Sequence, residues 1–332
     1  MLRKLTARGE RWPLSRPFRI SRGVKTQADV VTVEIAADGA VGMGEATPYG
    51  RYGETTDSVL TQIEGVRAAI EAGASREALQ VLLPAGAARN ALDCALWDIE
   101  AKLCGRTVAE MIGAPEPRRM VTAVTISLDA PSVMGEAANS LSGCPLIKVK
   151  VDANDPVAAV RAVREAAPLA RLIVDPNESW SVAQLEVWQA EMCALEVALL
   201  EQPIPAEEDR ALERLKPLVP ICADEAVHVR ADLKKLAGRY QAVNIKLDKT
   251  GGLTEALALR EAASAMGMTL MVGCMIGTSL AMTPALHVAR DANFVDLDGP
   301  WWLAQDRENR LVFSDGWLTP PSHGWGMHAA RP

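Results

Sequence analysis

Three carboxylates and two lysines, each closing a short apolar segment, form the most informative pattern in the sequence. In chain order they are Lys150, Asp175, Glu201, Asp224 and Lys246, separated by 22 to 26 residues, about one strand–helix unit. A charge at the end of a buried strand needs compensation for its lost hydration. In a parallel barrel all the C-terminal strand ends lie on one face. We therefore expect these side chains to meet in a divalent-metal site with acid–base lysines.

The carboxylates Asp175, Glu201 and Asp224 end consecutive segments, so they would lie side by side and repel each other. A bound cation relieves that repulsion, and an all-oxygen ligand set favours Mg²⁺, with Mn²⁺ as the second choice. Asn177 and Gln202 are expected to hydrogen-bond to these ligands from outside. A helix N-cap would explain any one of the acids, but less readily three in succession.

The lysines Lys150 and Lys246 lie two strands to either side of Glu201 in the expected barrel, so they would face each other across a substrate. Such a pair can remove a proton from one face of a carbon and return one to the opposite face. A basic lysine must be neutral, and its reference pKa near 10.4 is too high. Repulsion from Lys148 and from the metal is expected to lower the pKa. The metal would hold a substrate carboxylate and neutralise an enediolate.

Further charged residues fall in the last strand and in the early loops. Asp296 and Asp298 share one face of FVDLDGP and could hold a substrate ammonium group, although a helix cap with a turn residue explains the spacing equally well. The loops PFRISRGVKTQ and ATPYGRYGET could bring Arg22, Lys25 or Arg51 to an anionic substrate.

The composition excludes several classes of protein. The formal charge of −7 disfavours a broad nucleic-acid surface, and no apolar stretch approaches the ~20 residues that span a membrane. The N-terminal segment lacks the apolar region of a secretory signal. The six cysteines show no CxxC spacing, which argues against a disulfide framework and fits a reducing cytosol. We expect a cytoplasmic protein acting on a small molecule, with neither nucleic acid nor membrane as a partner.

The elements that must position these residues fall into two parts. Residues 1–115 read as an α+β unit, with a strand in DVVTVEIAAD and helical spacing over 58–73 and 88–105. Eight apolar segments separated mostly by Ala- and Leu-rich helical patterns follow, at 121–127, 146–151, 171–175, 196–201, 219–224, 242–247, 269–274 and 294–298.

Eight alternating strand and helix units indicate an α/β fold, a modified TIM barrel over 116–304 with an N-terminal α+β capping domain. An open doubly wound sheet is the competitor, but no GxGxxG follows a first strand. The tail, about 305–332, is expected to pack back on the capping domain. Strand parity supports the barrel, because Lys148 and Lys150 share one face, as do Asn244 and Lys246.

The motifs KVK, VDPNESW, EQP, ADE and NIKLDKTGG together resemble the muconate-lactonizing branch of the enolase superfamily. With DLDGP added, the chain resembles dipeptide epimerases of the L-Ala-D/L-Glu type. The likeness extends over nearly the whole chain, including PFRISRG, TPYGRYGE and LPAGAARNALDCALWD. It implies an enolase-type barrel under a capping domain.

The resemblance also implies roles for individual residues. Lys150 and Lys246 would be the two bases, and Asp175, Glu201 and Asp224 the Mg²⁺ ligands. The residues implied to bind substrate are Lys148 at the substrate carboxylate, Asp296 and Asp298 at the free ammonium, Arg22 at a glutamate side chain, and Thr125, Cys274 and Met275 along the pocket. Pro176 departs from the family pattern, where a small residue is more usual, but the ligand before it is retained.

We therefore expect a Mg²⁺-dependent isomerase that epimerises the C-terminal residue of a dipeptide, L-Ala-L/D-Glu, in peptidoglycan recycling during cell-wall turnover. An N-acylglutamate racemase would use the same five residues without an ammonium site. A β-elimination of the o-succinylbenzoate synthase type would need only one lysine as base. A barrel that binds metal and ligand without turnover is the non-enzymatic alternative. Barrels of this type often assemble, so a homo-oligomer stays open.

Overall fold

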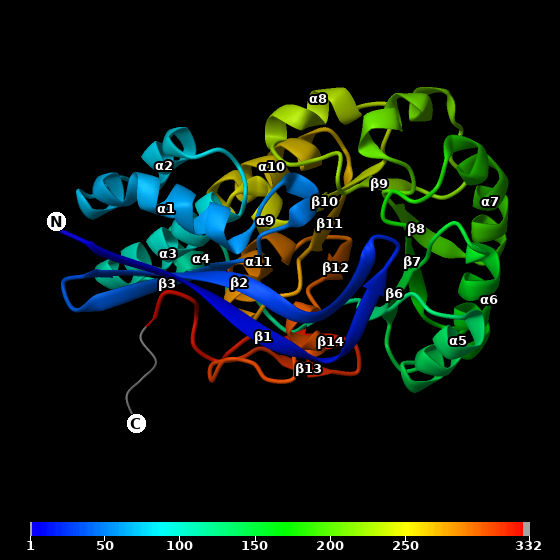
Figure 1. Cartoon of the computed structure of the whole chain (residues 1–332), viewed down its shortest axis with the longest axis horizontal. Coiled ribbons are helices and arrows are strands. Elements are labelled where there is room, and N and C mark those ends of the chain that lie inside the picture. The colour runs from blue at the N-terminus through cyan, green and yellow to red at the C-terminus, as the bar shows by residue number, and fades with distance from the viewer. Residues whose placement is uncertain (1, 328–332) are drawn as a thin grey trace.

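The structure is a computed structural model, and it describes residues 2–327. The N-terminal part is an antiparallel sheet of three strands, β1 (Lys4–Ile20), β2 (Gly23–Ala37) and β3 (Ala40–Ala46), in the order β1-β2-β3. Its helical elements are η1 (Gly50–Tyr52), α1 (Thr56–Glu71), α2 (Arg76–Leu82), α3 (Ala87–Cys104) and α4 (Val108–Met111). The long β1–β2 hairpin reaches from this capping domain over the barrel strands (Figure 1).

Helix α3 lies directly on strand β3, and two glycines permit this close approach. A Cβ atom at Gly42 would overlap the carbonyl oxygen of Ala95, and one at Gly44 would overlap that of Ala91. The helix is buried along most of its length, although its sequence is only weakly amphipathic, because it packs between the sheet and the barrel.

The second part is a parallel barrel, and all eight strands expected from the sequence are present. The order is β12-β11-β10-β9-β8-β7-β6-β5, and the N–H of Ala123 donates to the carbonyl of Val295 at 2.7 Å where the two edges meet. The strands are β5 (Val124–Ile126), β6 (Leu146–Lys150), β7 (Arg171–Asp175), β8 (Val197–Glu201), β9 (Ile221–Ala223), β10 (Ala242–Ile245), β11 (Thr269–Gly273) and β12 (Phe294–Asp296).

The connections between barrel strands are helices of unequal length, which lie outside the strands in Figure 1. After β8 and β9 the chain forms short 3₁₀ and single-turn segments in place of long helices, because these segments are rich in charge or contain Pro and Gly. The connecting elements are α5 (Pro131–Ser140), α6 (Pro156–Ala166), α7 (Val182–Ala194), η2 (Ala206–Arg214), η3 (Arg230–Asp232), α8 (Leu233–Leu236), α9 (Leu247–Thr250), α10 (Leu253–Ala265), α11 (Ser279–Ala289) and η4 (Gly299–Trp302).

The interior of the barrel is layered by strand parity. One layer is apolar and consists of Ala123, Leu146, Ile173, Leu199, Cys222, Ala242, Met271 and Phe294. Moving two residues along each strand toward its C-terminal end keeps the side chain pointing inward. The layer reached in this way contains Thr125, Lys148, Asp175, Glu201, Asp224, Asn244, Gly273 and Asp296. This apolar layer therefore lies directly beneath the polar site.

The C-terminal segment contacts both parts of the molecule. Strands β13 (Val312–Ser314) and β14 (Trp317–Thr319) form a small sheet with β4 (Met120–Val121) at the start of the barrel. Arg307 reaches the capping domain, where its Nη2 atom lies 2.6 Å from a Glu45 carboxylate oxygen and 2.8 Å from a Glu10 oxygen. Within the described residues no helix is long and apolar enough to cross a membrane.

Candidate active site

A cavity of about 360 Å³ lies where the capping-domain loops meet the C-terminal ends of the barrel strands. Its wall combines residues from both parts of the molecule. The polar and charged lining residues are Arg22, Lys25, Tyr49, Arg51, Tyr52, Thr125, Lys148, Lys150, Asn177, Asp224, Glu225, Lys246, Asp296 and Asp298, and Cys274 and Met275 contribute softer groups.

The two lysines proposed as bases lie on opposite sides of the carboxylate row, on β6 and at the end of β10. Lys150 Nζ is 2.5 Å from Asp175 Oδ2, and Lys246 Nζ is 2.7 Å from Asp224 Oδ2. Both lysines are buried and line the cavity. Each is thus held at the mouth of the barrel by a neighbouring carboxylate.

Lys148 is the central cation of the site. Its Nζ atom lies within 3.1 Å of oxygens of Asp175, Glu201 and Asp296, and the side chain is almost fully buried. Burial lowers the pKa of Lys148, but the carboxylates outweigh burial and raise it well above its usual range. The ammonium group therefore stays charged.

The pKa of Lys246 is raised in this structure, so repulsion from Lys148 alone does not lower it as expected. Burial and the charge of Lys148 lower its pKa, but Asp224 and Glu201 raise it by more. The physical reason is that each lysine touches a carboxylate, whereas like-charge repulsion acts over a longer distance. A cation bound at the carboxylates would weaken this attraction and so favour a neutral lysine.

The donor chemistry of the carboxylate row fits a hard divalent cation. Burial and the charges of Asp175 and Asp224 raise the pKa of Glu201 to about 8, and a bound cation would oppose both effects. Within residues 2–327 no group of three or more His, Cys, Asp or Glu side chains stands in a ligating arrangement, and lysine ammonium groups lie against these carboxylates. Ligation would require those ammonium groups to move aside.

The sequence pattern predicts that Asn177 and Gln202 hydrogen-bond to the carboxylates through their side chains. Both contact Asp175 or Asp224, but through other pairs of groups. The backbone N–H of Asn177, not its side chain, donates to Asp175 Oδ1 at 2.9 Å. The side-chain oxygen of Gln202, Oε1, accepts the N–H of Asp224 at 2.9 Å, and the side-chain NH₂ group donates to Ile204 and Tyr240 instead of to the carboxylates. Both residues have a positive φ, 48° and 36°, because the chain turns sharply after each strand.

Lys249 is a residue of the site that the sequence interpretation did not single out. It is fully buried on the single-turn helix α9, and its Nζ atom is 2.6 Å from Asp224 Oδ1 and 3.0 Å from the carbonyl oxygen of Asn244. It also donates to the backbone carbonyl of Asp224. With three acceptors, the ammonium has no free donor. The motif KLDKTGG contained the only signal, a second lysine one helical turn after Lys246.

Asp296 and Asp298 both reach the cavity, opposite the carboxylate row. Asp298 Oδ2 accepts the N–H of Thr125 at 2.8 Å, and Asp296 Oδ2 accepts from Lys148 at 2.8 Å. The remaining oxygen of Asp296 is buried and has no hydrogen-bond partner among the described residues. Burial and the charge of Asp296 raise the pKa of Asp298 to about 6. Two carboxylates in this setting can hold an ammonium group.

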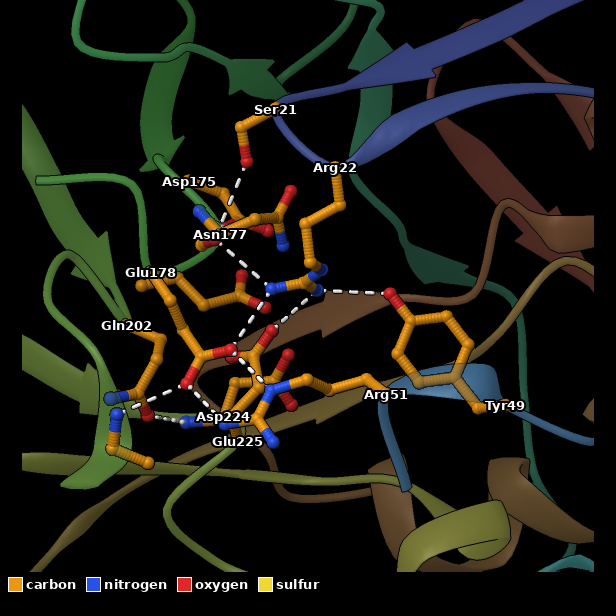
Figure 2. A network of polar contacts seen from close by, with 12 residues as sticks. Ser21, Arg22, Tyr49, Arg51, Asp175, Asn177, Glu178, Gln202, Asp224 and Glu225 are labelled. Carbon is orange, nitrogen blue, oxygen red and sulfur yellow. Dashed lines mark hydrogen bonds and ion pairs between the residues drawn. The ribbon is translucent and has the colours of Figure 1, made fainter. Parts of the chain in front are cut away.

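Arg22 lies at the tip of the β1–β2 hairpin, and its guanidinium is hydrogen-bonded to other residues of the chain (Figure 2). One terminal nitrogen donates to the Asn177 carbonyl at 3.0 Å and to Glu178 at 3.1 Å. The other donates to the Tyr49 hydroxyl at 2.9 Å and to Glu225 Oε1 at 2.7 Å. The hairpin tip is therefore tied to the barrel loops that follow β7 and β9.

Lys25, also in the capping domain, has an ammonium group with fewer partners among the described residues than the guanidinium of Arg22 or Arg51. It is half-buried, lines the cavity and lies 5.1 Å from the centre of the Tyr49 ring. Burial lowers its pKa, and the nearby Asp29 opposes that shift. Among the described residues no hydrogen bond or ion pair within 4 Å engages its ammonium. Arg51, in contrast, pairs with Glu178 at 2.8 Å and with Glu207 at 2.7 Å.

Two family models cover most of the chain. Residues 2–113 match the N-terminal domain of mandelate racemase and muconate lactonizing enzymes, and residues 133–331 match the enolase C-terminal domain-like family. The chain belongs to the enolase superfamily.

Named relatives within the superfamily are epimerases and racemases. The chain is 50% identical over 311 residues to L-Ala-D/L-Glu epimerase of Escherichia coli strain K12, covering 93% of this chain and 97% of the relative. It is 44% identical over 300 residues to N-acetyl-D-glutamate racemase of a Pseudoalteromonas species, covering 90% and 95%. The protein is accordingly an isomerase of the racemase and epimerase type.

Solved structures agree with this assignment. An enolase family member from Agrobacterium tumefaciens with homology to dipeptide epimerases, with bound sodium and L-Ala-L-Glu, superposes with a TM-score of 0.94 at 48% identity, covering 96% of this chain and 98% of that chain. A dipeptide epimerase from Methylococcus capsulatus, complexed with Mg and L-Arg-D-Lys, superposes with a TM-score of 0.89 at 31% identity, covering 98% of this chain and 99% of that chain. The enolase-type barrel and its capping domain are thus confirmed.

Proposed function

We propose that this protein is a Mg²⁺-dependent dipeptide epimerase that inverts the α-carbon of the C-terminal residue, with L-Ala-L/D-Glu as its substrate. The observation that carries the proposal is the composition of one cavity wall. Lys150 and Lys246 line it from opposite sides of the carboxylate row, and Asp296 and Asp298 line it together with them.

The two lysines would exchange the α-proton in a 1,1-transfer. One neutral lysine takes the proton from one face of the α-carbon, and the other, charged, returns a proton to the opposite face of the enediolate. Either lysine can act as base, depending on the substrate's configuration. Asp175, Glu201 and Asp224 would hold Mg²⁺, which would supply positive charge to polarise the substrate carboxylate and to stabilise the enediolate. Mn²⁺ could substitute for it.

The remaining lining residues would orient the dipeptide. Asp296 and Asp298 would bind its ammonium group, and Lys148 would contact its carboxylate. Thr125 holds Asp298 through its backbone N–H, and Cys274 and Met275 would contact the peptide from the loop that follows β11.

Lys25 is better placed than Arg22 to receive a glutamate side-chain carboxylate. The donors of Arg22 already serve Glu178, Glu225, Tyr49 and Asn177. Lys25 reaches the same cavity without such partners among the described residues. We therefore transfer this role from Arg22 to Lys25.

Proton NMR in D₂O tests the proposal directly. With enzyme and Mg²⁺, L-Ala-L-Glu should lose its glutamate α-proton signal while the L,D diastereomer appears. N-acetyl-L-Glu is followed in parallel. If the dipeptide keeps its α-proton signal and no new diastereomer appears, the substrate assignment is refuted.

Racemisation of N-acylated glutamate is the second candidate, because a relative 44% identical over 300 residues is named N-acetyl-D-glutamate racemase. That reaction uses the same lysines and carboxylates but has no ammonium group to bind. Asp296→Asn and Asp298→Asn variants would damage dipeptide epimerisation most and N-acylglutamate racemisation least. The setting proposed for the dipeptide reaction is cytoplasmic recycling of peptidoglycan peptides.

A further inference from the structure

Glu225 is a buried carboxylate in the cavity wall that the proposed reaction does not use. It follows Asp224 at the end of β9, lines the cavity, and its side chain is 1% exposed. Its Oε1 atom accepts from Arg22 at 2.7 Å, whereas its Oε2 atom is buried without a hydrogen-bond partner among the described residues. The wall therefore presents an ionisable carboxylate at this point, and one of its two oxygens is not engaged by the described residues.

The charge of Arg22 does not extend into the cavity as a free cation. Its guanidinium is shared by the two carboxylates Glu225 and Glu178 (Figure 2). The capping-domain charge that is left to attract an anion is that of Lys25, near the same hairpin tip. At this end the wall therefore combines a lysine that attracts an anionic side chain with a glutamate that, when ionised, repels it.

Strand order places this end of the cavity opposite the proposed ammonium site. In the ring of eight strands, β12 carries Asp296 and lies across from β8, while Glu225 and Glu178 follow the flanking strands β9 and β7. A dipeptide with its ammonium at Asp296 and Asp298 would extend its C-terminal side chain toward this end.

We propose that Glu225 is a specificity-determining residue that limits how strongly the cavity prefers an acidic over a neutral C-terminal side chain. This inference rests on the proposed dipeptide epimerisation. Lys25 attracts a side-chain carboxylate and Glu225 repels it, so uncharged side chains of the same shape remain competitive as substrates.

The test compares L-Ala-L-Glu with L-Ala-L-Gln, which have nearly the same shape and differ by one charge. Glu225→Gln removes the charge and can still accept a hydrogen bond from Arg22. Its ratio of kcat/KM for the Glu over the Gln peptide should rise about tenfold, the effect of a like charge roughly 10 Å away at an effective dielectric constant near 20. Glu225→Asp retains the charge, so its ratio should stay near that of the unaltered chain.

Glu178→Gln is the matched control, because Glu178 also binds Arg22 but does not line the cavity. Its ratio should stay close to that of the unaltered chain. An unchanged or lower ratio in Glu225→Gln, or an equal rise in Glu178→Gln, overturns the assignment.

The ratio of dissociation constants for the two peptides, measured by calorimetry, gives the same readout without turnover. A chain that binds both peptides but epimerises neither refutes the proposed function and still decides the role of Glu225. Thermal unfolding of each variant shows whether it is folded.

Discussion

At the scale of single residues, the site is a set of buried charges that neutralise each other. Lys150 touches one carboxylate, Lys246 touches Asp224 and lies 3.9 Å from Glu201, and Lys148 touches three. A buried ammonium without such partners would be costly. The same contacts raise the pKa of Lys148 and of Lys246, so Lys246 must lose part of this attraction before it can act as a base.

Two opposed bases predict that each lysine serves one configuration of the substrate. Lys150→Met and Lys246→Met should each lower epimerisation by at least about 100-fold. In D₂O each variant should still exchange the α-proton of one diastereomer, and the two variants should differ in which one. Exchange of the same diastereomer in both variants would refute the opposed arrangement.

The proposed role of Lys25 predicts a selective loss. Lys25→Met should lower kcat/KM for L-Ala-L-Glu by about tenfold, because one ion pair in a partly solvated site is lost. The value for L-Ala-L-Gln should change little, since that side chain carries no charge. An equal loss with both peptides would mean that the substitution disturbs the hairpin.

At the scale of elements, the β1–β2 hairpin and the loop around η1 close the cavity by binding the loops after the barrel strands. The contacts are charged on this side, through Arg22, Arg51 and Glu178. On the opposite side the capping domain docks by buried polar groups. Asp248, on helix α9, accepts the N–H of Thr47 and the side-chain amide of Asn90, each at 2.9 Å.

Because Asp248 is buried in this contact, we predict that the free energy of unfolding depends on pH through its ionisation. Burial, opposed by those two hydrogen bonds, raises its pKa from 3.8 to about 7. The protonated form is thus favoured in the folded state, so the contribution of Asp248 to the free energy of unfolding is lost as pH rises from about 4 to about 7. The loss is at most about 1.4 kcal/mol per pH unit.

Asp248→Asn removes this titration and keeps an oxygen that can accept both hydrogen bonds. Compared with the unaltered chain, the variant should become relatively more stable between pH 5 and pH 8, values roughly spanning that titration. Urea unfolding at several pH values measures the difference. Parallel stability curves for the two proteins would contradict the prediction.

At the scale of the whole molecule, the cavity belongs to both parts of the fold, since the capping domain contributes Arg22, Lys25, Tyr49 and Arg51 and the barrel contributes the other charges. We propose the division into a capping domain at 1–115, joined by the tail at about 305–332, and a barrel at 116–304. Arg307 in the tail ties the two parts together, because it contacts Glu45 and Glu10 of the capping domain and the Thr278 hydroxyl of the barrel, the last at 2.7 Å.

A divalent cation bound only by the folded chain should stabilise the whole molecule. At 100 times its dissociation constant, Mg²⁺ should add about 2.7 kcal/mol, which corresponds to a Tm increase of roughly 5 °C. EDTA should reverse the shift, and Glu201→Gln should reduce it. A Tm that is independent of Mg²⁺ in the unaltered chain would argue against the metal site.

The sequence by itself determined the eight strands and the inward direction of the lysines, because parity and strand length are local properties of the backbone. It also placed Asp175, Glu201 and Asp224 at neighbouring strand ends, since connections in a parallel barrel are sequential. These features depend on spacing along the chain, which one sequence displays directly.

Only the tertiary structure decided which charges face each other. The engagement of Arg22 by Glu178 and Glu225, the burial of Lys249 and the freedom of Lys25 depend on loops that are distant in sequence. So does the direction of the Lys246 pKa shift, which is set by contact with Asp224. Electrostatic energies vary steeply with distance and burial, and neither quantity can be obtained from spacing along the chain.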